Sequence, residues 1–159
     1  MAGAKPAYVY RFAKTSEWIA AMDLAWRTFS RFNAAEYSEE GIRNFYDFVT
    51  DVGLYESFLR GEYQMMVALD GETIIGLATV RNGNHLSLLF VDEAYQGRGI
   101  GKTLLIHMCR YLRFEMGEEY MTLTAAPLAV EFYKKMGFRV TKPETTVSGI
   151  RVTGMEIDL

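Results

Sequence analysis

The first third of the chain carries apolar residues at helical spacing, after one short extended segment. Residues 7–13, AYVYRFA, are expected to form the first strand. Thr15 and Ser16 offer an N-cap for the helix that follows, whose apolar positions share one side. These positions are Trp18, Ile19, Met22, Trp26 and Phe29. Ser38 introduces a second predicted helix over residues 41–49.

The period then changes to that of strands. Three apolar runs, at residues 63–69, 73–80 and 85–91, are separated by short polar segments. An Asp-Gly pair follows the first run and an RNGN segment follows the second. Such pairs favour hairpin turns, because Asn, Asp and Gly tolerate the positive φ that tight turns require. Three consecutive antiparallel strands are therefore expected.

The remainder of the chain alternates helices and strands. The predicted elements are a helix from about Gly99 to Met116, a strand at 120–125, a helix at 127–136, and strands at 137–140 and 149–159. A strand, a long helix and another strand in succession predict parallel neighbours. The expected fold class is α/β, with a mixed, mostly antiparallel central sheet flanked by helices. No repeat or linker interrupts the chain, so a single domain over residues 1–159 is expected.

Composition narrows the function classes. A net charge of -3 and a pI near 5.5 give no electrostatic basis for binding nucleic acid. The sequence has one cysteine, Cys109, and two histidines, His85 and His107, so neither an internal disulfide nor a dedicated zinc site is expected. The N-terminus lacks the apolar core of a signal peptide, and no segment reaches the roughly 20 apolar residues that span a membrane. A cytoplasmic protein without membrane partners fits these features best.

The stretch FVDEAYQGRGIGKTLL, residues 90–105, places a glycine-rich turn between an apolar run and the long helix. Such turns bind phosphate, because backbone N–H groups at a helix start are unpaired and face outward. The two common nucleotide motifs fail on spacing. Gln96 stands where a P-loop needs its first glycine, and Lys102 stands where the dinucleotide fingerprint needs its third.

Two motifs make the chain resemble the GNAT acyltransferases, which move an acyl group from acyl-coenzyme A to an amine. The family's phosphate loop, Gln/Arg-x-x-Gly-x-Gly/Ala, is similar to residues 96–101, QGRGIG. A second family pattern, Ala-x-x-Phe-Tyr-x-x-x-Gly-Phe, is similar to residues 129–138, AVEFYKKMGF. The resemblance implies the GNAT acyl-CoA N-acyltransferase fold. It also implies acetyl-coenzyme A as co-substrate, without a metal.

The resemblance further implies which residues hold the coenzyme. Its pantetheine arm would pair with the strand before the loop, where a bulge would aim an N–H group at the thioester carbonyl. Its pyrophosphate would bind the loop. Thr124 stands where the family often has an asparagine, so that contact would lose an amide. The implied cofactor-binding residues are Leu89, Phe90, Val91, Gln96, Gly97, Arg98, Gly99, Ile100, Gly101, Lys102, Thr103, Thr124 and Phe132.

Two side chains are candidates for the proton transfers of this chemistry. Tyr133 matches the tyrosine of the second motif, whose hydroxyl in the family lies near the thioester sulfur, so we expect it to be the acid. His85 begins the strand before the loop, where some family members carry a glutamate base. A histidine there would remove the amine's proton, directly or through a water molecule. The alternatives are a packed ring for Tyr133 and a polar turn residue for His85.

The acceptor site is expected near the first interhelical turn, where the family usually builds it. Its candidate residues are Phe29, Phe32, Glu36 and Tyr37. The predicted reaction is direct transfer of acetyl to a primary amine in a ternary complex, with a non-catalytic coenzyme-A-binding regulatory module as the alternative. The acceptor would be a small molecule, a peptide or a protein. A homodimer would use the exposed edge of the last strand.

Overall fold

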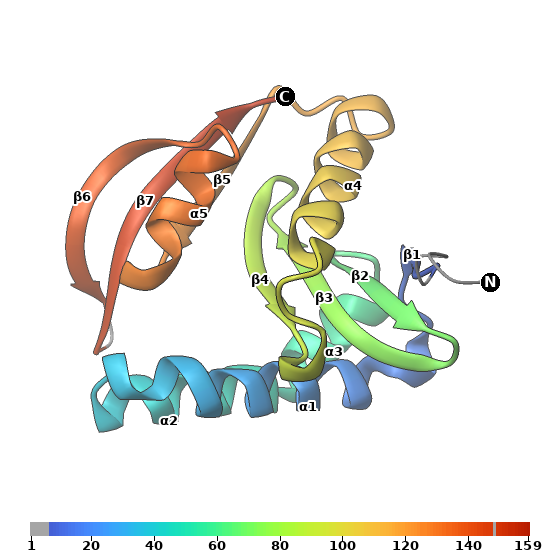
Figure 1. The fold of residues 1–159 in the computed structure, drawn as a ribbon, viewed down its shortest axis with the longest axis horizontal. Coiled ribbons are helices and arrows are strands. Elements are labelled where there is room, and N and C mark those ends of the chain that lie inside the picture. Colours follow the sequence, from blue (N-terminus) through green and yellow to red (C-terminus); the bar gives the residue numbers. More distant parts are fainter. Residues whose placement is uncertain (1–6, 148) are drawn as a thin grey trace.

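The structure is a computed structural model that describes residues 7–147 and 149–159. Over these residues, seven strands form one sheet in the order β1-β2-β3-β4-β5-β7-β6 (Figure 1). The strands are β1 (Val9–Phe12), β2 (Tyr63–Asp70), β3 (Thr73–Arg81), β4 (His85–Val91), β5 (Tyr120–Ala125), β6 (Arg139–Val147) and β7 (Ile150–Asp158). The α-helices are α1 (Trp18–Thr28), α2 (Glu39–Val49), α3 (Val52–Leu59), α4 (Ile100–Phe114) and α5 (Val130–Lys135). The predicted fold class, a mixed and mostly antiparallel sheet flanked by helices, is confirmed.

The antiparallel strands β1 to β4 follow the predicted turns. The turn between β2 and β3 has Gly71 at φ 61°, and the turn between β3 and β4 has Asn82 and Gly83 at φ 52° and 85°. Glycine and asparagine adopt this left-handed region with less strain than other residues. The prediction of three consecutive antiparallel strands is confirmed.

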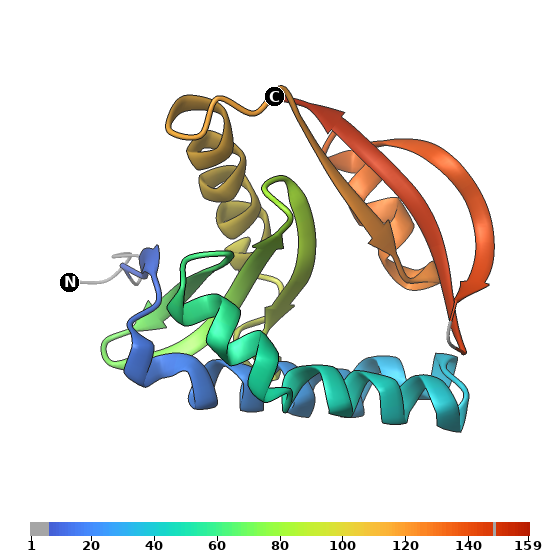
Figure 2. The same cartoon turned by 180° about the vertical axis from the view of Figure 1, so that it is seen from behind.

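The sheet divides between β4 and β5. These two strands are parallel, as predicted for a strand–helix–strand unit, but they pair only at His85↔Thr122 and Leu86↔Leu123. Beyond these pairs β4 and β5 diverge, so β5, β7 and β6 form an arm that leans away from the rest of the sheet (Figures 1 and 2). This division leaves one edge of β4 without a strand partner over the rest of its length.

A second contact joins this arm to the start of helix α2, at the far end of β6 and β7. Ser38, just before α2, donates its hydroxyl to the carbonyl of Gly149 at 3.0 Å. Gly149 has φ +78°, and a Cβ on Gly41 would lie 2.7 Å from the Gly149 carbonyl oxygen. The close approach of α2 to the β6–β7 turn therefore requires glycine at both positions.

The last strand has no free edge, contrary to the sequence expectation. β7 pairs with β5 on one side and with β6 on the other. The exposed edge belongs to β6, in which all nine residues are exposed. Lys142 and Pro143 lie in the middle of β6, and such residues discourage pairing with another strand. The proposed dimer edge on β7 is therefore wrong.

The core has two layers, one on each face of the sheet. Helix α4 buries Leu104, Met108 and Leu112 against one face. Helix α1 buries Trp18 and Met22 against the other, together with parts of α2 and α3. Figures 1 and 2 show these helices on opposite sides of β2 and β3. In the described part of the chain, no helix combines the length and apolar character needed to cross a membrane.

The helix starts differ from the sequence expectation in two places. A 3₁₀ turn, Thr15–Glu17, precedes α1, and its N-cap is Lys14, so the predicted cap at Thr15-Ser16 is wrong. The Glu17 carboxylate instead accepts the Lys14 N–H at 2.7 Å and pairs with Arg11 at 2.8 Å. Helix α3 was not predicted. By contrast, Ser38 caps α2 as expected, and its hydroxyl accepts the N–H of Gly41.

Candidate functional site

A cavity of about 540 Å³ lies where β4, the glycine loop, the start of α4 and α5 meet. We call it the loop cavity. It is lined by Thr28, Phe32, Asn33, Leu89, Phe90, Val91, Tyr95, Gln96, Gly97, Gly99, Ile100, Gly101, Lys102, Leu128, Ala129, Phe132 and Tyr133. Most of the residues implied for coenzyme binding are thus brought together, from segments far apart in the sequence.

The glycine loop presents its backbone to this cavity. Gly97 and Gly99 have φ of +79° and +78°, and nothing lies within 4 Å of where a Cβ would be on either residue. Gly99 is also the N-cap of α4, whose first turn leaves backbone N–H groups unpaired. The helix dipole adds partial positive charge at the same point. The loop therefore has the donors and the open space that a phosphate group requires.

The two cations of the loop point in different directions. Lys102 lines the loop cavity. The Arg98 guanidinium donates to the Tyr8 hydroxyl at 2.8 Å and lies over the Tyr95 ring, 5.0 Å from its centroid. Tyr95 in turn donates its hydroxyl to Asp70 at 2.6 Å. Arg98 therefore ties the loop to Tyr8, just before β1, whereas Lys102, in the first turn of α4, is the cation that lines the cavity.

Strand β4 offers its unpaired edge beside the loop. Pairing with β5 stops after His85 and Leu86. The next part of the strand, Leu89, Phe90 and Val91, lines the loop cavity, as the resemblance implied. An unpaired strand edge binds an extended amide chain through backbone groups, as an added strand would.

The ladder between β3 and β4 shows which backbone groups face that edge. Asp92 donates its N–H to the carbonyl of Ile75 at 2.8 Å, so this pair is hydrogen-bonded. Hydrogen-bonded and non-hydrogen-bonded pairs alternate along an antiparallel ladder. The backbone groups of Leu89 and Val91 therefore face away from β3, toward the open edge. In agreement, the Val91 carbonyl accepts the side-chain amide of Gln96 at 3.2 Å.

A β-bulge interrupts β4 just before this segment. Thr79 pairs with Leu88, but the next β3 residue, Val80, pairs with Leu86. Ser87 is therefore the extra residue on β4. A bulge in this strand was implied by the resemblance and is confirmed.

Tyr133 combines burial with a free hydroxyl. It lines the loop cavity, and its side chain is only 8% exposed because it packs edge-on against Phe132 and Phe138. Burial raises the pKa of the Tyr133 hydroxyl above its ordinary value, so the group stays protonated at neutral pH. Among residues 7–147 and 149–159, this hydroxyl makes no hydrogen bond, and the oxygen atom itself is not among the fully buried ones that lack a partner. It is therefore a proton donor available to a ligand.

His85 lies at the point where β4 and β5 separate. Its Nδ1 is 2.8 Å from the Thr122 hydroxyl on β5. Burial, and then the positive charge of Arg81, lower the pKa of His85 below its ordinary value. The ring is therefore neutral at pH 7, and Nε2 remains for a second partner. His85 itself is outside the described lining of the loop cavity.

The candidate acceptor residues divide between core and surface. Phe29 is 1% exposed and stacks on Phe45, with 4.0 Å between ring centroids, so it belongs to the core. Phe32 lines the loop cavity. Glu36 and Tyr37 follow in the interhelical turn, where the Glu36 charge adds to burial in raising the pKa of Tyr37. Among the described residues, only Glu36 has a buried side-chain oxygen, Oε2, without a hydrogen-bond partner.

Besides Arg98, two implied cofactor residues, Thr103 and Thr124, do not line the loop cavity. Among the described residues of β5, Thr124 is exposed beside the divergence and is not part of the lining. Thr103 donates its hydroxyl to the Gly99 carbonyl at 2.9 Å, so it stabilises the start of α4. Conversely, sequence reasoning missed Thr28, which precedes a π-helical turn (Phe29–Asn33), and Asn33, the last residue of that turn; both line the cavity. A π turn has no sequence motif that would have identified it.

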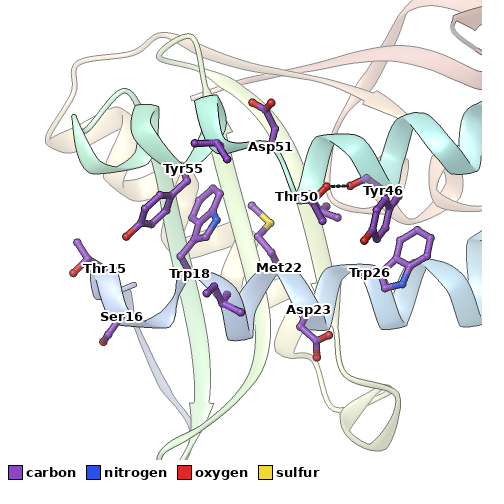
Figure 3. Close-up of a pocket in the computed structure, with 13 residues that line it drawn as sticks. Thr15, Ser16, Trp18, Met22, Asp23, Trp26, Tyr46, Thr50, Asp51 and Tyr55 are labelled. Atoms are coloured by element: carbon purple, nitrogen blue, oxygen red, sulfur yellow. Dashed lines mark hydrogen bonds between the residues drawn. The ribbon is translucent and has the colours of Figure 1, made fainter.

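A second, larger cavity of about 810 Å³ lies across the helices on the other face (Figure 3). We call it the helix cavity. It is lined by Thr15, Ser16, Trp18, Ile19, Met22, Asp23, Trp26, Tyr46, Val49, Thr50, Asp51, Val52 and Tyr55. Its residues come from α1, α2 and α3 and the segments next to them. None of them was a candidate from the sequence.

The described residues contain no group of three or more His, Cys, Asp or Glu side chains that would hold a metal ion. The thiol of Cys109 is partly buried on α4, and burial raises its pKa to about 11. The thiol is therefore protonated at neutral pH and is a weak nucleophile.

The described geometry has close parallels among known proteins. A family model described as an acetyltransferase (GNAT) domain matches residues 33–159. Over 59 residues, the chain is 42% identical to the peptidyl-lysine N-acetyltransferase YjaB of Salmonella typhimurium. That alignment covers 37% of this chain and 39% of the relative, so the chain spans well under half the length of that curated protein.

Two solved structures are similar over nearly their full lengths. The GCN5-related N-acetyltransferase from Rhodopseudomonas palustris has a TM-score of 0.82 and 22% identity, with 100% of this chain and 99% of that chain covered. The PaiA N-acetyltransferase from Thermoplasma acidophilum, in complex with coenzyme A, has a TM-score of 0.81 and 21% identity, with 96% and 99% covered. At these identities the likeness establishes the fold.

Proposed function

Because the chain belongs to the GNAT acetyltransferase family, we propose that residues 1–159 form a single domain that moves an acetyl group from acetyl-coenzyme A to a primary amine. The transfer is direct, in a ternary complex. The observation that carries this proposal is the convergence of three features on the loop cavity. They are the glycine loop at the start of α4, the open edge of β4 and the free hydroxyl of Tyr133.

The residues present fit the coenzyme. The backbone N–H groups after Gly99, with Lys102, would hold its pyrophosphate. The backbone groups of Leu89 and Val91 would bind the amides of its pantetheine arm. Acetyl-coenzyme A supplies an acetyl group that is activated as a thioester.

The two titratable candidates have complementary protonation states. An alkyl ammonium has a pKa of about 10, so a base must take its proton before attack. With Nδ1–H donating to the Thr122 hydroxyl, neutral His85 would accept that proton at Nε2, directly or through a water molecule. Protonated Tyr133 would donate its hydroxyl proton to the departing sulfur. The burial of each side chain thus keeps Tyr133 protonated, as an acid requires, and His85 neutral, as a base requires.

The interhelical turn supports a cationic acceptor. Glu36 Oε2 is buried and, among the described residues, lacks a hydrogen-bond partner. A carboxylate oxygen in that state is stabilised by an ammonium group. Phe32, which lines the loop cavity from the same segment, would contact the apolar part of the acceptor. We therefore propose an amine that carries a second positive charge or lies close to one.

The test is thiol release from acetyl-coenzyme A across a panel of amines, polyamines, peptides and amino sugars. The wild-type chain should release coenzyme A with at least one of them. Tyr133→Phe should lower kcat about 100-fold, the scale of a lost general acid, with coenzyme A affinity retained by calorimetry. Tyr120→Phe is a matched control, because Tyr120 is 43% exposed at the start of β5 and does not line the loop cavity.

Two outcomes would contradict the proposal. Full activity in Tyr133→Phe would remove Tyr133 from the mechanism. Tight coenzyme A binding without release across the whole panel would instead support the non-catalytic coenzyme-A-binding module.

A further inference from the structure

Three hydroxyl groups, from three adjacent strands, meet at the bulge of β4. The Tyr63 hydroxyl, from β2, lies 2.7 Å from Thr79 Oγ1 on β3. The same hydroxyl donates to Ser87 Oγ on β4 at 3.3 Å. Thr79 therefore donates to Tyr63, and Tyr63 donates to Ser87. Such chains strengthen each bond through polarisation in a buried setting.

The surroundings of Tyr63 fix its position. Tyr63 is 2% exposed and Thr79 is 0% exposed. The Tyr63 ring packs edge-on against Trp18 at 5.9 Å and Phe48 at 6.4 Å between centroids. Burial raises the pKa of Tyr63, so its hydroxyl keeps the proton that it donates. The hydroxyl is thus a rigid anchor for Ser87.

Ser87 is the one residue of β4 that has no opposite partner on β3. On one side of it, Leu86 still pairs with Leu123 of β5. On the other side, the backbone of Leu89 faces the open edge and the loop cavity. The position of Ser87 therefore sets where the Leu89 N–H group points.

We propose that Tyr63 is a positioning residue for acetyl transfer, which acts by holding Ser87 in the bulge and so aiming the Leu89 N–H group at the thioester carbonyl. This inference rests on the proposed function. An N–H group that meets developing negative charge must be held in place before the reaction, and an error of about 1 Å costs up to about 100-fold in rate. Nothing in the reaction itself requires a buried tyrosine at the start of β2.

The test compares Tyr63→Phe and Ser87→Ala, which each remove one end of the Tyr63–Ser87 hydrogen bond and keep the rest of the side chain. Each should lower kcat about tenfold, with the acceptor KM and the coenzyme A Kd within twofold of wild type. The double variant should be no slower than either single variant, because both changes remove the same bond. The amides of Ser87 and Leu88 should exchange hydrogen about tenfold faster in both single variants, as measured by NMR.

Two further variants separate positioning from general loss of stability. Thr79→Val removes a buried hydroxyl but keeps the Tyr63–Ser87 bond, so it should lower the free energy of unfolding and leave kcat within twofold of wild type. Tyr55→Phe is the matched control. Tyr55 packs on the same Trp18, 5.7 Å between centroids, and comes from α3 rather than from the sheet.

The outcomes distinguish this inference from the proposed function. A wild-type chain that releases no thiol with any amine contradicts the function, and the exchange measurement then decides whether Tyr63 holds the bulge. An active wild type with an equally active Tyr63→Phe overturns the inference alone. Multiplicative losses in the double variant would overturn it as well, because Tyr63 and Ser87 would then act separately.

Discussion

The helix cavity and the loop cavity differ more in the groups that line them than in size. The helix cavity, at about 810 Å³, is the larger, and the sides of α1, α2 and α3 provide most of its lining. The loop cavity, at about 540 Å³, lies at the ends of elements, where β4 stops and α4 begins. Backbone groups on the side of a helix are already paired, whereas those at helix starts and strand edges are not. The smaller cavity therefore has the donors that a phosphate and an amide chain require.

The polar side chains of the two cavities follow the same division. In the helix cavity, Asp23 pairs with Arg27 at 2.9 Å, and Asp51 caps α3 by accepting the Leu54 N–H at 2.8 Å. Local structure thus already occupies both carboxylates. In the loop cavity, by contrast, Tyr133 keeps a hydroxyl free of described protein partners. The smaller cavity therefore holds the side chain with an unused donor, although the larger cavity has more volume.

The largest effect expected is the loss of the proposed base, His85. His85→Gln should lower kcat/KM about 100-fold at pH 7, because the ammonium substrate then has no protein base. In the wild type, activity should be retained as pH falls through about 6.5, the ordinary pKa of histidine, and be lost at a lower pH. The sign follows from the lowered pKa of His85, since only the neutral ring accepts a proton. A pH–rate profile measures this shift.

His107→Gln is the matched control for that profile. His107 is exposed on α4 and stacks on Tyr10, with 5.3 Å between ring centroids. Its replacement should leave the acidic limb unchanged. The same acidic limb in His85→Gln as in wild type would exclude His85 as the base.

Alanine substitutions at two glycines should have a smaller effect on coenzyme A binding, and together they separate backbone strain from phosphate binding. Gly99 and Gly61 have φ of +78° and +77°, and neither would place a Cβ within 4 Å of another group. Alanine at either position should cost about 1 to 2 kcal/mol in the free energy of unfolding, the strain of this conformation. Only Gly99→Ala should also weaken coenzyme A binding, by about tenfold. Calorimetry and urea unfolding measure the two effects. Equal coenzyme A affinity in both variants would contradict phosphate binding at the loop.

The elements predicted best from the sequence are those with alternating or continuous apolar residues. The strands between Tyr63 and Val91 agree with prediction to within one residue at each end, because apolar runs and tight turns mark them. Helix α3 was missed because only Thr50 and Asp51 separate it from α2, and two residues are too short an interruption to mark a second helix in the sequence. Strand β6 extends well beyond the predicted 137–140, but all its residues are exposed and so show no alternation.

The residues of the candidate site likewise differ in how far they could be predicted, according to whether they depend on neighbouring or on distant parts of the sequence. The loop motif and Tyr133 were identifiable, since each depends on a few consecutive residues. The bulge at Ser87 depends on the register between β3 and β4, and its anchor Tyr63 is 24 residues away in sequence. The direction of Arg98 depends on Tyr8, 90 residues away. Such contacts have no local pattern, so only the folded chain reveals them.

The smallest expected effect tests the comparison of the cavities directly. Ile19 and Leu128 are both exposed aliphatic residues, at 81% and 73%, and they line the helix cavity and the loop cavity respectively. Ile19→Ser should leave kcat/KM within twofold of wild type, and Leu128→Ser should raise the acetyl-coenzyme A KM about threefold, through lost apolar contact. Neither should change the free energy of unfolding by more than about 0.5 kcal/mol, because exposed side chains contribute little to stability. Steady-state kinetics with urea unfolding measure all four values. A larger kinetic effect from Ile19→Ser than from Leu128→Ser would mean that the helix cavity takes part in the reaction, and the division drawn from backbone donors would then be wrong.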